Sequence, residues 1–161
     1  MTRLLMATAV IVLVVFSSDR VLAQDNPAIG TWKLNLAKSK YNNPVQAPMS
    51  QTRKVEAQGK GVKVSYEGVA ADGSGIAYSF TSNYDGRDSL ISGSGQGTGA
   101  DTIAMKRIDS HTTVSIMKKA GKVIATTRTV ISKDGRVTTV TSKGTDAKGQ
   151  PRNTVSVFDK Q

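Results

Sequence analysis

The sequence predicts an all-β protein: an antiparallel up-and-down β-barrel of about ten strands. Three observations lead to this prediction. Apolar and polar residues alternate along many short segments, which is the period of a half-buried strand. Glycine turns, several of them Asp-Gly, separate these segments at hairpin spacing, because both residue types tolerate positive φ. The connections are too short for the crossovers that parallel strands need.

The first 23 residues have the pattern of a signal peptide. A short cationic start, Met1-Thr2-Arg3, precedes an apolar run over residues 4–16, and Val21-Leu22-Ala23 offers small residues where a signal peptidase reads. The run is shorter than the ~20 residues that cross a bilayer. We expect cleavage after Ala23, a mature barrel domain over residues 24–161, and a secreted or periplasmic protein. An uncleaved anchor is the alternative.

The first expected strand holds the only tryptophan of the chain. Within Thr31–Leu36, Trp32, Leu34 and Leu36 share one face. We expect Trp32, just after Gly30, to plug one end of the barrel. Residues 37–49 contain prolines, which do not occur in central strands. This stretch is therefore expected to be a crossover loop with one helical turn.

The other expected strands form a meander with Asp72-Gly73, Asp85-Gly86 and Asp134-Gly135 among its turns. They cover residues 50–57, 62–67, 76–84, 88–92, 101–108, 111–118, 122–132, 136–143 and 153–159. Closing such a meander into a barrel removes its exposed edges. A two-sheet sandwich is the alternative.

The side chains expected on the inner face of the barrel are small and polar compared with those of a solid core. Strand 122–132 places Val123, Ala125, Thr127, Thr129 and Ile131 on one side, and strand 136–143 places Thr138, Val140 and Ser142 there. A solid core favours larger aliphatic side chains. Small and hydroxylated residues therefore indicate either a lumen that holds a ligand or an exposed face assigned to the wrong side. Barrels of this size can enclose one small ligand.

Both ends of the chain resemble calycin barrels. Gly30-Thr31-Trp32 resembles the Gly-x-Trp that opens the first strand of lipocalins, and Gly30–Leu34 and Val157–Lys160 are similar to the first and last strands of fatty-acid-binding proteins. The chain also resembles bacterial secreted lipocalin-like proteins, through residues 30–41, 141–145 and 149–150. The resemblance implies a calycin barrel with Trp32 packed across its closed end.

The departures from these families bear on the ligand. Residues 37–49 are too short and too proline-rich for the helix pair of fatty-acid-binding proteins. Ser156 stands where their last strand carries an arginine of the carboxylate clamp, so a fatty-acid function is not carried over. Lipocalins often pack a late arginine over the tryptophan, and Arg152 is the candidate for that position.

Seven residues are candidate ligand contacts. Tyr66, Tyr78, Phe80 and Tyr84 can stack on a flat ligand and orient it with their hydroxyls, or they are simply core. Arg107 shares the parity of Met105 and would need an anion if buried, whereas at the rim it would be solvated. The list of expected ligand contacts is Tyr66, Tyr78, Phe80, Tyr84, Met105, Arg107 and Thr127.

The composition does not favour an enzyme. The chain has no cysteine and one histidine, His111, which lies in a turn after Asp109-Ser110. No paired carboxylates suggest acid–base catalysis, and we expect no metal and no cofactor. The glycine-rich residues 93–99 lack the Gly-Lys-Ser/Thr ending of a phosphate loop. They read as a flexible loop that can lie beside the barrel mouth.

Two functions follow from these patterns. The preferred one is a secreted, non-enzymatic, monomeric barrel that binds a small apolar or amphipathic molecule in its lumen. The formal net charge is +10, from 22 Lys and Arg against 12 Asp and Glu. This charge supports the alternative, an envelope-associated protein that binds anionic polymers through its outer surface. We expect no nucleic acid partner, because the basic residues are dispersed and aromatic residues make up only 5% of the chain.

Overall fold

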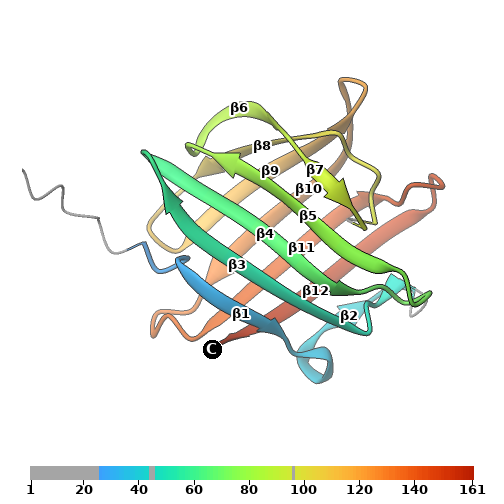
Figure 1. Cartoon of the computed structure of the whole chain (residues 1–161), viewed down its shortest axis with the longest axis horizontal. Coiled ribbons are helices and arrows are strands. Elements are labelled where there is room, and N and C mark those ends of the chain that lie inside the picture. The colour runs from blue at the N-terminus through green and yellow to red at the C-terminus, as the bar shows by residue number, and fades with distance from the viewer. Residues whose placement is uncertain (1–25, 44–45, 96) are drawn as a thin grey trace, which may run out of the picture.

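A computed structural model describes residues 26–43, 46–95 and 97–161, and the predicted signal peptide lies outside these residues. The described chain forms one antiparallel sheet that curls into a nearly closed barrel (Figure 1). This confirms the predicted fold class. Within the described ranges, no helix has the length and apolar character needed to cross a bilayer.

The strands follow the predicted hairpins closely. They are β1 (Gly30–Leu34), β2 (Lys40–Tyr41), β3 (Ser50–Gln58), β4 (Gly61–Val69), β5 (Gly75–Ser82), β6 (Asp85–Leu90), β7 (Ser92–Ser94), β8 (Thr102–Arg107), β9 (Thr112–Lys119), β10 (Lys122–Ile131), β11 (Val137–Thr145) and β12 (Pro151–Lys160). The sheet order is β6-β8-β9-β10-β11-β12-β1-β3-β4-β5-β7, with β2 paired to β12. The first and last long strands are therefore neighbours, as a closed meander requires.

The sheet closes through one segment that changes partner. This segment contains β6, which pairs with β8, and then β7, which pairs with β5. The expected turn at Asp85-Gly86 is wrong, because both residues lie in β6. The chain reverses instead at Asn83 and Tyr84, where the Ser82 hydroxyl accepts a hydrogen bond from the Tyr84 amide at 3.0 Å. Gly86, at φ +77°, lies where the β6–β8 register shifts between Asp85 and Asp88, so its positive φ serves a bulge.

The first strand ends earlier than its apolar alternation predicts. Leu36 was expected beside Trp32 on the inner face, but it belongs to a 3-10 turn, η1 (Leu36–Lys38), and is 45% exposed. The Asn35 side chain accepts a hydrogen bond from the Lys38 amide at 3.1 Å and caps this turn. The expected helical turn after the first strand is present, and the short β2 follows it.

One residue of the expected inner face points outward. Val123 is 58% exposed, whereas Ala125 and Ile131 on the same strand are buried. The β9–β10 register shifts between Val123 and Ala125, so a bulge reverses the alternation there. The sequence carries no sign of this extra residue.

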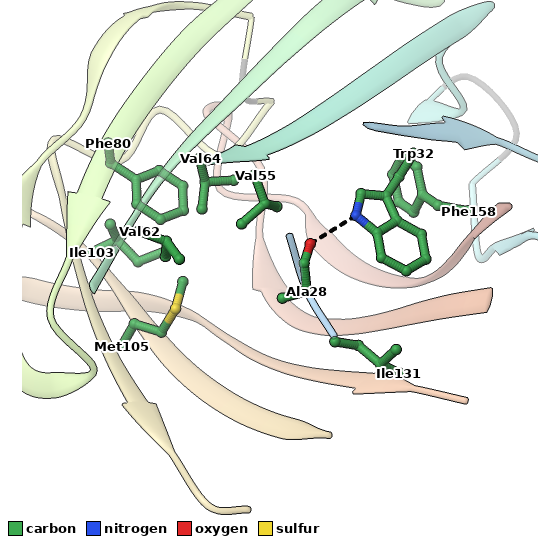
Figure 2. Packing of buried hydrophobic residues seen from close by; sticks show 10 residues of the cluster. All are labelled: Ala28, Trp32, Val55, Val62, Val64, Phe80, Ile103, Met105, Ile131 and Phe158. Atoms are coloured by element: carbon green, nitrogen blue, oxygen red, sulfur yellow. Dashed lines mark hydrogen bonds between the residues drawn. The ribbon is translucent and has the colours of Figure 1, made fainter. Parts of the chain in front are cut away.

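Trp32 closes one end of the barrel. Its side chain is 0% exposed, and its Nε1–H donates to the Ala28 carbonyl at 2.9 Å. Figure 2 shows the indole beside Phe158, with Val55 and Val64 connecting this group to Phe80 and its neighbours. The lead-in segment before β1 thus folds under the indole, at the end of the barrel on the left of Figure 1. We call this buried cluster of Ala28, Trp32, Val55, Val62, Val64, Phe80, Ile103, Met105, Ile131 and Phe158 the floor.

Gly30 is favoured by its backbone conformation and lies against Lys160. It has φ +137°, which side chains disfavour, and an added Cβ would lie 2.8 Å from Cε of Lys160. The Lys160 ammonium lies 5.1 Å from the centroid of the Trp32 ring, as a cation–π contact. The end of the Lys160 side chain thus lies between Gly30 and the Trp32 ring.

Replacing Trp32 by alanine should destabilise the protein by about 3–5 kcal/mol, because the floor loses its largest side chain and retains a cavity. Trp32→Phe should cost less, since it keeps the ring contacts but removes the hydrogen bond to Ala28. Urea unfolding followed by circular dichroism measures both. Val123→Ala, on the exposed side of β10, is the control and should change stability by no more than about 0.5 kcal/mol. A Trp32→Ala variant as stable as this control would contradict the role of the floor.

Candidate ligand cavity

A cavity of about 580 Å³ occupies the half of the barrel opposite the lead-in segment. Its mouth is formed by four connecting segments: the chain around Gln46, the β4–β5 turn, the glycine-rich segment after β7, and the β11–β12 turn. A volume of this size lies within the range of small-molecule sites. The predicted lumen is therefore present in the structure as an internal space.

The cavity has an apolar base and hydroxylated walls. Phe80, Ile103, Met105 and Phe158, all part of the floor, line its base. Its walls carry the hydroxyl groups of Tyr41, Tyr66, Tyr78, Thr98, Ser115, Thr127, Thr129, Ser142, Thr154 and Ser156. Such a space offers apolar contact at depth and many possible hydrogen bonds around it.

Five of the seven expected ligand contacts line this cavity: Tyr66, Tyr78, Phe80, Met105 and Thr127. Their alternation on β4, β5, β8 and β10 turns them all inward. Thr127 already donates a hydrogen bond to the Ser142 hydroxyl at 3.3 Å, across the β10–β11 pair. Their contact with a ligand remains a prediction.

The other two, Tyr84 and Arg107, are not among the residues that line the cavity. The Arg107 guanidinium carbon lies 4.1 Å from the centroid of the Tyr84 ring, and the Tyr84 hydroxyl accepts a hydrogen bond from Asn26 at 3.3 Å. This places both side chains beside the lead-in segment, away from the mouth. Arg107 faces inward by strand parity, at the last position of β8. Its guanidinium makes a cation–π contact with Tyr84 and forms no ion pair among the described residues.

Arg53 lines the cavity but is not among the ligand contacts that the sequence predicts. It lies on β3, is 5% exposed, and its Nε–H donates to the Tyr66 hydroxyl at 3.1 Å. In the sheet register it stands between Trp32 of β1 and Tyr66 of β4. Its position two residues before Val55, on the apolar side of β3, was the signal that could have revealed it.

The late basic residue over the tryptophan is Lys160 and not Arg152, the candidate from the sequence. Arg152 lies at the start of β12, lines the cavity near its mouth, and has its guanidinium against Gly97. The two residues are at opposite ends of the same strand, which explains why only one of them can reach the indole.

The mouth segments are tied to one another. Gln46 donates to the Asp146 carboxylate at 3.2 Å, and the Ala147 amide donates to the Gly97 carbonyl at 3.3 Å. Gly95, Gly97 and Thr98 line the cavity beside the mouth, whereas Gly93 and Ser94, expected in the same loop, belong to β7 and pair with β5.

Tyr66 and Tyr78 form a stacked pair in the wall. Their ring centroids lie 4.7 Å apart and the planes differ by 16°. Burial raises the pKa of Tyr78 well above its usual 10.0, the neighbouring Tyr66 adds to this, and the charges of Arg152 and Arg53 oppose it. Tyr78 thus stays a neutral phenol at physiological pH and can donate a hydrogen bond into the cavity.

The described residues assemble no other chemical site that the sequence suggested. Among them, no three His, Asp or Glu side chains come together as a metal site. His111 lies in the β8–β9 turn, where its Nδ1 lies 2.8 Å from the exposed Ser110 hydroxyl and its amide donates to Asp109. The three residues make local turn contacts at the surface.

Alkaline pH should destabilise the protein partly through Tyr78. Above the usual tyrosine pKa the unfolded chain loses the Tyr78 proton while the folded chain retains it, so this contribution is intact below pH 10 and falls above it. Between pH 9 and pH 11, Tyr78→Phe should lose about 1 kcal/mol less stability than the unmodified protein in urea unfolding. Parallel losses in the two proteins would show that burial does not hold this proton.

No protein-family model matches the chain, and the search of curated proteins found no match. The structure itself supports the coarser statement that the chain forms an antiparallel, nearly closed β-barrel, a shape compatible with calycin barrels.

Proposed function

We propose that this chain is a secreted or periplasmic lipocalin-like carrier, without enzymatic activity, that binds one small apolar or amphipathic molecule in its lumen. The observation that carries the proposal is the 580 Å³ cavity inside the barrel, with a packed floor at one end and a loop-lined mouth at the other. The signal-peptide pattern of residues 1–23 supports the location.

Burial of the ligand supplies most of the affinity in this proposal. Covering about 300 Å² of apolar ligand surface contributes about 7 kcal/mol before the cost of association is subtracted. The hydroxyl groups of the cavity walls offer hydrogen bonds to the polar part of the molecule. In this proposal the barrel acts as a monomer.

A second candidate is association with anionic envelope polymers. It is favoured by the direction of the basic side chains: Lys33, Lys54, Lys63, Arg128 and Lys143 all lie exposed on the outer face of the strands. Salt screens the attraction between exposed charges and an anionic polymer. It hardly changes the free energy of burying an apolar ligand in the lumen. Ionic strength therefore separates the two functions.

The neutral probe N-phenyl-1-naphthylamine should bind in the lumen and gain fluorescence. Thr127→Trp, which fills the cavity from β10, should weaken its binding by at least about tenfold, the equivalent of ~1.4 kcal/mol. Thr126→Trp is the matched control, because its neighbouring position on the same strand is exposed and its side chain faces solvent. Equal binding by both variants would place the probe outside the barrel.

The same titration at low and high salt tests the second candidate. The probe affinity should stay constant within about twofold between 50 and 500 mM NaCl. Retention on an anionic polymer that survives the Thr127→Trp substitution and disappears at high salt would favour the outer surface instead.

A further inference from the structure

Arg53 is the one basic side chain among the described residues that is buried. Its exposed fraction is 5%, while the other lysines and arginines of the described ranges are half-buried or exposed. It stands on the cavity wall, one inward position from the floor residue Val55. A permanently charged group is therefore held deep in the lumen.

The charge of Arg53 is incompletely paired. Its Nε–H is used by the Tyr66 hydroxyl, but its Nη1 has no hydrogen-bond partner among the described residues. The ion pairs of those residues join Lys38, Lys54, Arg87 and Lys118 to carboxylates, and none includes Arg53. The acidic residues that line the cavity, Asp72 and Asp146, are instead bonded to neighbours in the mouth segments.

This arrangement is costly for the empty protein. A guanidinium cannot lose its proton in a protein, so it cannot escape burial by becoming neutral. A buried charge without its full set of partners destabilises the fold. An anion that enters the cavity would satisfy the free donor, and it would do so where little solvent screens the interaction.

A second donor stands beside it. The Tyr66 oxygen accepts from Arg53, which leaves the Tyr66 proton available, and no described group accepts it. Arg53 and Tyr66 are register partners on adjacent strands, and both residues line the cavity. Oxyanions with two or more equivalent oxygens, such as carboxylates and sulfonates, can accept hydrogen bonds from a guanidinium and a neighbouring hydroxyl.

We infer that the ligand of this barrel is an amphipathic oxyanion, whose charged group is bound deep in the lumen by Arg53 and Tyr66 while its apolar body packs on the floor. The inference rests on the proposed function and names the class of its ligand. The site is on β3 and β4; the last strand, where the fatty-acid-binding proteins that the chain resembles place a clamp arginine, carries Ser156. Arg107, the sequence-based candidate for the anion, contacts Tyr84 instead.

Two probes with the same ring system test this inference. N-phenyl-1-naphthylamine is neutral, and 8-anilinonaphthalene-1-sulfonate carries one oxyanion on that skeleton. Titrations use the mature full-length chain, with Thr127→Trp to confirm that each signal comes from the lumen. The quantity of interest is the ratio of the two affinities.

Arg53→Met should reduce the affinity for the sulfonate by about tenfold or more, as expected for a charge-assisted hydrogen bond, and change that for the neutral probe by less than about threefold. Lys54→Met is the matched control: it removes the same charge from the next position of β3, where the side chain is exposed and paired with Glu56. This control should leave the affinity ratio unchanged.

The outcomes separate the inference from the function on which it rests. If both probes bind in the lumen and Arg53→Met leaves their ratio unchanged, the anion site is wrong and the carrier stands. If neither probe binds in the lumen, the carrier itself is wrong. If Arg53→Met does not fold, Arg53→Lys replaces it: the ammonium lacks the planar fork, so the sulfonate should still lose affinity relative to the neutral probe. An unchanged ratio in Arg53→Lys would then overturn the inference.

Discussion

The packing of Trp32 against the lead-in segment and Phe158 determines how the interior of the barrel is divided. A cylinder of short hairpins has two open ends, and an open end admits water to every inward side chain. The indole blocks one end, and its hydrogen bond to Ala28 fixes the segment that folds beneath it. Figure 2 shows the buried apolar residues that pack with the indole. Because the apolar side chains are concentrated there, the other half is left to small and hydroxylated ones.

That second half is the cavity. Serine and threonine residues on β9 to β12 are too short to meet across the lumen, so the space between them persists. Their hydroxyls make the walls polar without adding charge, and Arg53 adds one charge at depth. The same constraint therefore gives the barrel a stable base and a space in which a molecule with an apolar part and an anionic part finds matching surroundings.

The sequence predicted the architecture well because the fold follows from local patterns. Alternation, glycine turns and the place of Trp32 are each visible within a few residues, and together they indicate the nearly closed antiparallel barrel. The errors are local departures from alternation: the bulge that exposes Val123, the bulge that places Asp85 and Gly86 inside β6, and the early end of β1 that exposes Leu36. Bulges insert one residue and leave no compositional mark.

The site was less predictable than the fold, for a different reason. Inward parity identified Tyr66, Tyr78, Phe80, Met105 and Thr127 as lining residues. It could not tell at which end of the barrel a side chain lies, so Arg152 was the candidate for the position over Trp32 that Lys160 occupies. Arg53 was missed because an arginine in a polar strand normally reads as an outer residue. Its burial depends on partners from β1 and β4 that only the sheet register supplies.

Native mass spectrometry of the protein purified from its own source tests the central claim most directly, namely that the lumen of the closed barrel holds a small molecule. We expect one bound molecule per mature chain, released on unfolding, with an ionisable oxyanion in its structure, and absent from the Thr127→Trp variant. A chain that stays empty after exposure to an extract of its source, or that retains the same adduct when Thr127→Trp fills the cavity, would contradict it.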